Sequence, residues 1–158
     1  MDKQFIPVNT PLLKGNEEKY VVECIRTGWI SSEGPFIKEF EEKFASYVGR
    51  KHAIAVCNGT AAIDAAVEAL EIGEGDEIIM PTFTIISCIS QIIRSGALPV
   101  FIDCDPLTWN MDVTQIEKKI SERTKAIFVV HIYGLPVDMD PVLALGKKYN
   151  LRIIEDAA

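Results

Sequence analysis

The chain has 158 residues, of which 48% are hydrophobic and 25% are charged, a composition typical of one soluble globular domain with a substantial core. Its formal net charge of -7 argues against a general nucleic-acid-binding protein, although it is compatible with one small phosphorylated ligand held by local donors. Four cysteines without a CxxC pair, and two histidines far from them, give no spacing typical of a metal site. Reduced thiols, the lack of a signal-peptide core and the lack of a membrane-length apolar run together predict a cytoplasmic protein.

The first 50 residues are predicted to form an N-terminal arm followed by two helices. Two prolines disfavour a helix in the arm, and the first helix is expected over residues 16–27 with Gly28 ending it. Pro35 opens the second helix at its first turn, and Gly49 ends that helix. We therefore treat residues 1–50 and 51–158 as two parts of the chain.

Beyond residue 51, short apolar runs alternate with helical segments. The apolar runs are continuous rather than interleaved with polar residues, which is typical of parallel strands buried on both faces. The predicted fold class is therefore α/β, a mostly parallel open sheet with helices on both faces and right-handed crossovers. The predicted strands are 53–57, 77–80, 100–104, 126–131 and 151–155, and the predicted helices are 60–72, 85–95, 112–120 and 140–149.

The turn Asn58-Gly59-Thr60 follows the first predicted strand and begins a helix. A buried strand, a glycine turn and a helix start together make an anion site, because free N–H groups point out of the first turn and the helix dipole favours negative charge. Gly59 lets the backbone approach a ligand closely, and Thr60 adds a hydroxyl donor. The alternative is that Asn58 or Thr60 only caps the helix.

Polar side chains gather where the predicted strands end, which is the edge at which open parallel sheets bind ligands. The motifs GxGxxG and GxxxxGK[ST] are both absent, which disfavours a dinucleotide-binding or nucleotide-hydrolysing domain. A carboxylate directly after a buried strand, here Asp156, suits another chemistry, because it can keep the ring nitrogen of pyridoxal phosphate protonated. Asp156 could equally cap a following segment, His131 could be a hydrogen-bonded core histidine, and Trp29 could serve packing alone.

Five segments in matching order and spacing resemble the DegT/DnrJ/EryC1/StrS family of sugar aminotransferases: WISSEGPFI, CNGTAAIDAAVEAL, GDEIIMPTFTIIS, VHIYGLPVDMD and IIEDAA. The resemblance implies a pyridoxal phosphate-dependent transferase of fold type I, usually a homodimer. Such enzymes move an amino group from glutamate to a keto carbon of a nucleotide-linked deoxysugar, for cell-surface polysaccharide or lipopolysaccharide synthesis. Neither a nucleic acid nor a membrane is an expected partner.

The resemblance also implies roles for individual residues. The cofactor phosphate is expected at the turn after the first strand, the ring nitrogen at the carboxylate after the last strand, and the substrate near the loop between the first two helices. A motif after the fourth strand lies near the cofactor edge. The implied cofactor-binding residues are Gly59, Thr60, Ala61, Ile85 and Asp156, and the implied substrate-binding residues are Trp29, Ser31, Ser32, His131 and Tyr133.

Two departures from the family pattern stand out. The family usually stacks an aromatic residue on the cofactor ring at the position of Ile85, which has no π face, and Phe83 could substitute only with a different backbone turn. In addition, the chain stops at Ala158, and the resemblance implies that the Schiff-base lysine and the small domain lie beyond that point. No lysine follows a predicted strand, so no catalytic residue is expected in this chain. We therefore interpret residues 51–158 as a partial cofactor-binding large domain. A truncated, non-catalytic paralogue that binds ligands or partner subunits, and a sugar dehydratase on the same scaffold, are the alternatives.

Overall fold

The structure is a computed structural model, and it describes residues 5–7 and 9–158. The chain divides into two compact units, one ending at Ala55 and one spanning Val56–Ala158. The N-terminal unit contains helices α1 (Glu17–Thr27) and α2 (Pro35–Tyr47). Gly28 ends α1 in the left-handed conformation, and Pro35 occupies the first turn of α2, as the sequence predicts.

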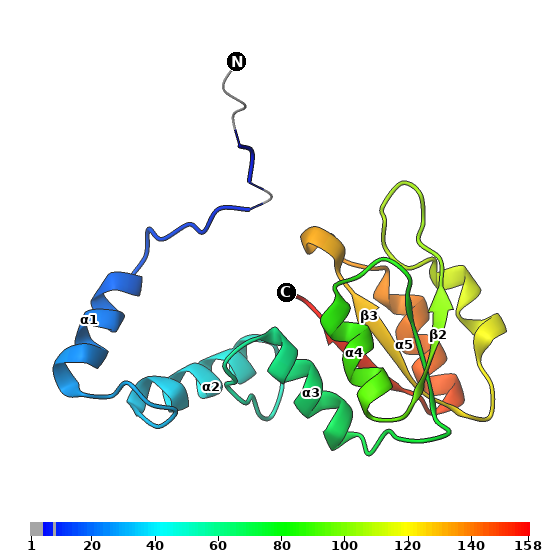
Figure 1. Cartoon of the computed structure of the whole chain (residues 1–158), viewed down its shortest axis with the longest axis horizontal. Helices are drawn as coiled ribbons and strands as arrows, with labels where there is room; N and C mark the ends of the chain where they lie inside the picture. Colours follow the sequence, from blue (N-terminus) through cyan, green and yellow to red (C-terminus); the bar gives the residue numbers. More distant parts are fainter. Residues whose placement is uncertain (1–4, 8) are drawn as a thin grey trace. The chain divides into compact units, whose positions relative to one another are not determined.

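The second unit is built on a four-stranded sheet in which all strands are parallel, in the order β2-β1-β3-β4 (Figure 1). Its elements follow one another along the chain as α3 (Gly59–Ala69), β1 (Glu77–Pro81), α4 (Ile86–Arg94), β2 (Leu98–Ile102), β3 (Thr124–Val130), α5 (Met139–Tyr149) and β4 (Arg152–Asp156). Three short 3-10 turns, Val113–Gln115, Glu117–Lys119 and Ile132–Gly134, complete the unit.

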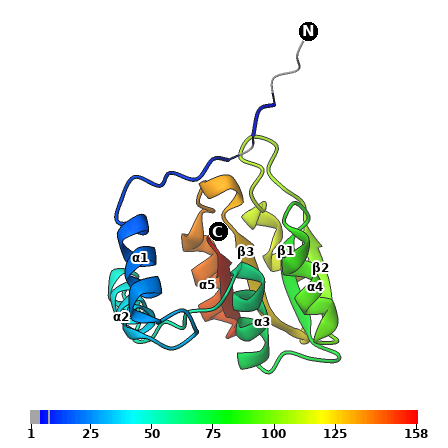
Figure 2. The ribbon, with the colours of Figure 1, turned by 60° about the vertical axis from the view of Figure 1, so that its left-hand side comes forward.

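Helices cover both faces of the sheet, which confirms the predicted fold class (Figure 2). On one face, residues of α3 and α4 pack on even-numbered residues of β3 and β4, for example Phe128 and Ile154. On the other face, α5 and the turns before β3 pack on odd-numbered residues such as Ile127 and Val129. Because side chains alternate along a strand, the central strand β3 is buried on both faces.

The prediction of a strand over residues 53–57 is wrong. This segment has no regular secondary structure, and Ile54 and Val56 are exposed. A strand exists only where a neighbour accepts its backbone hydrogen bonds, and within the described residues no strand pairs with this one. An apolar run of strand length was therefore not sufficient to make a strand.

The predicted helix over residues 112–120 is also different in the structure, which has two separate 3-10 turns there. The Asp112 carboxylate accepts hydrogen bonds from the Thr114 N–H, the Thr114 hydroxyl and the Gln115 amide. These local bonds compete with α-helical ones, and Ile116 is fully buried between the two turns. The capping role of Asp112 is confirmed, but the α-helix that it was expected to begin is not formed.

The order of the strands creates one place suited to ligands. After β1 the chain crosses to β2 on one side, and it then returns to place β3 on the other side of β1. The carboxyl ends of β1 and β3 therefore flank the point where the winding reverses, and open α/β sheets bind ligands at such points.

No helix in the described residues has the length and apolar character needed to cross a bilayer.

Candidate active site

The first turn of α3 presents backbone donors toward the carboxyl edge of the sheet. The helix ends just before the chain enters β1 at its amino end, so its N-terminus lies toward the opposite, carboxyl edge. Asn58 caps the helix, because its side-chain oxygen accepts from the Ala61 N–H at 2.9 Å. Within the described residues, the N–H groups of Gly59 and Thr60 have no acceptor. Two donors and the positive end of the helix dipole are therefore available to an anion.

Gly59 leaves open space where a side chain would lie. A Cβ atom built on Gly59 meets nothing within 4 Å. The backbone conformation here is one that other residues can adopt, so folding alone does not require glycine. The cap predicted as an alternative is confirmed for Asn58, and it leaves the N–H groups of Gly59 and Thr60 without an acceptor among the described residues.

Asp156 ends β4 with its carboxylate partly exposed and turned to the face covered by α3 and α4. Its Oδ2 accepts a hydrogen bond from the Cys88 thiol at 3.3 Å, and its Oδ1 accepts from the Ala158 N–H at 3.1 Å. An ionised carboxylate offers about four acceptor positions, so Asp156 keeps capacity for a further donor. This is the position predicted for the partner of a protonated ring nitrogen.

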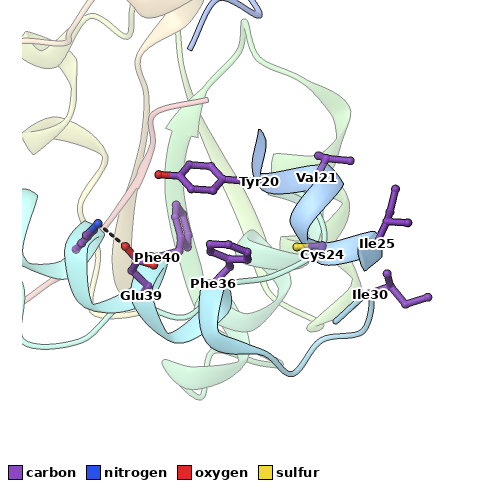
Figure 3. A pocket seen from close by; sticks show the side chains of 9 residues that line it. Tyr20, Val21, Cys24, Ile25, Ile30, Phe36, Glu39 and Phe40 are labelled. Atoms are coloured by element: carbon purple, nitrogen blue, oxygen red, sulfur yellow. Dashed lines mark hydrogen bonds and ion pairs between the residues drawn. The ribbon is translucent and has the colours of Figure 1, made fainter. Parts of the chain in front are cut away.

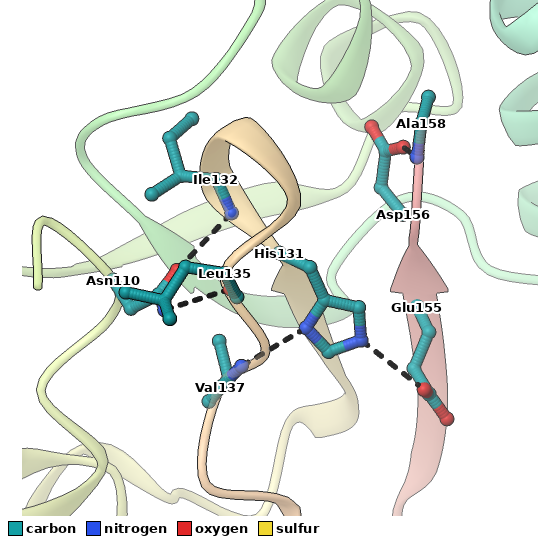
Figure 4. A network of polar contacts seen from close by, with 8 residues as sticks. All are labelled: Asn110, His131, Ile132, Leu135, Val137, Glu155, Asp156 and Ala158. Carbon is teal, nitrogen blue, oxygen red and sulfur yellow. Dashed lines mark hydrogen bonds and ion pairs between the residues drawn. The ribbon is translucent and has the colours of Figure 1, made fainter.

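His131 lies beside Asp156 in the backbone, but its ring belongs to a different network (Figure 4). The Val137 N–H donates to Nδ1 at 3.1 Å, so the proton sits on Nε2, which lies 3.4 Å from a carboxylate oxygen of Glu155. Glu155 and Asp156 are consecutive on β4, so their side chains point to opposite faces of the sheet. The structure therefore does not bring the His131 ring to the Asp156 carboxylate, and both ring nitrogens already have partners.

Tyr133 is exposed and belongs to an aromatic group at the same edge. The ring centroid of Phe83 lies 6.4 Å from that of Tyr133 and 5.5 Å from that of Trp109. These rings line a cavity of about 410 Å³ between the loops after β1, β2 and β3. Because Phe83 packs in this group while Ile85 is 61% exposed at the start of α4, Ile85 is the freer of the two side chains.

Trp29, Ser31 and Ser32 lie in the N-terminal unit, in the loop between α1 and α2. The Trp29 side chain packs against Gly34, where an added Cβ would lie 3.4 Å from it, and the Ser31 hydroxyl bonds within the loop to Glu33. The same unit carries an apolar cavity of about 550 Å³, lined by side chains that Figure 3 shows. The substrate role of these three residues stays a prediction.

Cys88 contacts Asp156 although no property of its place in the sequence predicts a role at the site. Thr84 lies in the loop after β1, just before α4, and its hydroxyl donates to the Cys88 sulfur at 3.3 Å. Nothing in the sequence indicated the contact of Cys88 with Asp156, which joins residues 68 positions apart.

Comparison with known proteins agrees with this geometry. The model of the DegT/DnrJ/EryC1/StrS aminotransferase family matches residues 11–158. The chain is 52% identical over 153 residues to the GDP-perosamine synthase of Caulobacter vibrioides, covering 97% of this chain and 41% of that protein. The chain is also 48% identical to the GDP-perosamine synthase of Escherichia coli O157:H7, covering 98% of this chain and 43% of that protein. The motifs of this chain are therefore similar to those of GDP-perosamine synthases.

Solved structures give the same result. An aminotransferase from Psychrobacter cryohalolentis superposes with a TM-score of 0.83 at 39% identity, covering 94% of this chain and 38% of the other. The Bacillus subtilis protein NtdA, solved with bound cofactor PMP, superposes with a TM-score of 0.81 at 34% identity, covering 89% of this chain and 32% of the other.

The chain thus spans about 40% of the length of the curated relatives it matches. These relatives are sugar aminotransferases, and the family depends on pyridoxal phosphate. A match that extends over nearly the whole chain, together with the parallel sheet and its ligand-binding edge, establishes the relationship. The chain belongs to the DegT/DnrJ/EryC1/StrS aminotransferase family.

Proposed function

We propose that this chain supplies the cofactor-binding part of an aminotransferase that moves an amino group from glutamate to a keto carbon of a nucleotide-linked deoxysugar. The observation that carries the proposal is the pairing, at one edge of the sheet, of a helix N-terminus with free N–H groups and a partly exposed carboxylate on the last strand. We expect the enzyme that carries out this reaction to be a homodimer in the cytoplasm.

The residues present fit pyridoxal phosphate. Gly59 and Thr60 would hold its phosphate through backbone N–H groups, and the open space at Gly59 leaves room for the phosphate oxygens. Asp156 would hold a proton on the ring nitrogen, and Ile85, exposed at the start of α4, would pack on the ring. When bound, the cofactor supplies an electron sink for the carbanion formed during amino transfer.

Ala61 has a smaller role in this proposal than the resemblance implies. Its N–H already donates to Asn58, so it supports the turn rather than donating to the phosphate. Tyr133 is exposed at the same edge and is our candidate for a contact with the substrate. His131 is retained only as a support for the loop after β3, because both of its ring nitrogens are engaged.

The test is a cofactor titration of Gly59→Val and Gly59→Ala variants. A branched side chain fills the space at Gly59 and separates the phosphate from the N–H groups, so we expect Gly59→Val to weaken pyridoxal phosphate binding by at least about 100-fold, with Gly59→Ala intermediate. Because a Cβ there meets no protein atom, both variants should keep a native melting temperature. Unchanged affinity in Gly59→Val would overturn the assignment of the phosphate site.

A non-catalytic, ligand-binding chain is the second candidate, and the placement of the lysines favours it for the isolated chain. Among the lysines in the described residues, none follows a strand; Lys125 sits at the amino end of β3, with its Nζ 3.8 Å from Asp76. We expect borohydride reduction of the chain with pyridoxal phosphate to label no single lysine stoichiometrically. One labelled lysine, together with amino transfer to a keto-sugar nucleotide, would contradict this second candidate.

A further inference from the structure

The thiol of Cys88 connects α4 to the end of β4. Cys88 is fully buried, with 0% of its surface exposed, and it lies in the core formed by α3, α4 and the sheet. Its sulfur accepts a hydrogen bond from the Thr84 hydroxyl at 3.3 Å and donates to Asp156 Oδ2 at 3.3 Å. Three side chains from the loop after β1, from α4 and from β4 thus form a chain of hydrogen bonds that ends on the carboxylate.

The direction of these bonds follows from the protonation state of the thiol. Burial raises the pKa of the Cys88 thiol to about 11, and the adjacent Asp156 carboxylate adds to the rise. The sulfur therefore carries its proton at neutral pH, and the carboxylate beside it is the natural acceptor. The thiol is an unreactive donor here rather than a nucleophile.

We propose that Cys88 is a positioning residue whose S–H, oriented by Thr84, fixes the rotamer of the Asp156 carboxylate at the carboxyl edge of the sheet. The inference rests on the proposed function, since it assigns Cys88 to the residue that we expect to face the cofactor ring nitrogen. A thiol is suited to the task because it is a weak donor that is also apolar enough for the core. It can orient the carboxylate without neutralising it, as a cationic partner would.

Two substitutions of similar volume separate this role from simple packing. Cys88→Ser keeps a donor toward Asp156 but places a hydroxyl in an apolar core, whereas Cys88→Val keeps the packing and removes the donor. If Cys88 positions Asp156, Cys88→Val should bind pyridoxal phosphate about threefold to tenfold more weakly than the unaltered chain, and Cys88→Ser should stay within about twofold. If Cys88 only packs, the serine variant should be the weaker binder.

The cofactor titration uses the whole 158-residue chain, with Cys104→Val as the matched control because Cys104 does not contact Asp156. Thr84→Val should weaken binding in the same direction as Cys88→Val but by less, because Thr84 acts through the sulfur. Binding by Cys88→Val equal to that of the unaltered chain, or weaker binding by Cys88→Ser than by Cys88→Val, would overturn the proposal.

A double-mutant cycle tests the contact without the cofactor. Urea unfolding of Cys88→Val, Asp156→Ala and the double variant should give effects that do not add, because either substitution alone already removes the hydrogen bond. Additive effects would overturn the inference, while the cofactor affinity of the Gly59 variants would still decide the proposed function. A chain that shows this coupling but binds no pyridoxal phosphate would overturn the proposed function, and the positioning role with it.

Discussion

The two faces of the sheet differ sharply where β3 and β4 end. On the face covered by α5, the His131 ring is held between the Val137 N–H and the Glu155 carboxylate, so both of its nitrogens have partners within the chain. On the face covered by α3 and α4, Asp156 has one thiol and one backbone donor, and the N–H groups at the start of α3 have no acceptor among the described residues.

A side chain whose hydrogen-bond partners all lie within the chain and one that keeps acceptor capacity for a ligand can thus be consecutive residues. Glu155 and Asp156 are neighbours in sequence, but the alternation of a strand sends one into a structural network and the other toward a ligand edge. Unused donors and acceptors that stay near water at the end of a parallel sheet are what a charged ligand requires. The open face is therefore the one on which cofactor affinity should depend.

Among substitutions that compare the two faces, the largest effect is expected for Asp156→Asn, compared with Glu155→Gln. Asparagine keeps the shape of aspartate but carries no charge, so it cannot hold a proton on the ring nitrogen. We expect pyridoxal phosphate affinity to fall about 10- to 100-fold, as for loss of a charged hydrogen bond, with little change for Glu155→Gln. Titrations monitored by cofactor absorbance provide the measurement, and equal effects of the two substitutions would contradict the distinction between the faces.

The next effect should appear in stability instead of binding. His131→Ala leaves the N–H of Val137, which is 5% exposed, without its acceptor. We expect the free energy of unfolding to fall by about 1–3 kcal/mol, the cost of an unsatisfied buried donor, and cofactor affinity to change by less than about twofold. Urea denaturation measures the first quantity, and a tenfold loss of affinity would instead place the His131 ring at the ligand site.

The smallest expected effect is a pH dependence of the free energy of unfolding, which arises from Cys88 on the face covered by α3 and α4. The pKa of Cys88 is about 11 in the folded chain and 9.0 for an ordinary thiol, so the unfolded chain loses this proton first as the pH rises. Stability due to the thiol is thus complete below pH 9 and is lost between pH 9 and 11, by about 1–2 kcal/mol. The difference between the unaltered chain and Cys88→Val isolates this contribution, and a constant difference over that range would contradict it.

Much of the fold could be predicted because the relevant signals are local. Continuous apolar runs predicted the ends of all four strands to within two residues, and both ends of β2 lie two residues nearer the N-terminus than predicted. The displacement occurs because the ladder with β1 begins at Leu98, and Asp103, just after the strand, bonds the Cys104 N–H with its own side chain. The predicted strand over residues 53–57 failed for a different reason: an apolar run indicates a strand but does not specify which strand it pairs with.

The candidate site could be predicted only in part for the same reason. Asp156 was recognisable because it directly follows a predicted strand, Gly59 was recognisable because a polar glycine turn begins a helix there, and the family motifs include both. The sequence did not reveal that His131 turns to Glu155, that Phe83 packs against Trp109, or that Cys88 reaches Asp156. Each of these depends on which face a side chain occupies and on what another element places beside it.

The sequence by itself determined the α/β class, the family and most residues that follow the strands, since periodicity, turn chemistry and motif order are properties of neighbouring residues. Only the tertiary structure decided which of those residues meet. Contacts across the sheet join side chains far apart in sequence, as Cys88 and Asp156 are, and their geometry is fixed by strand register and by the packing of helices on each face.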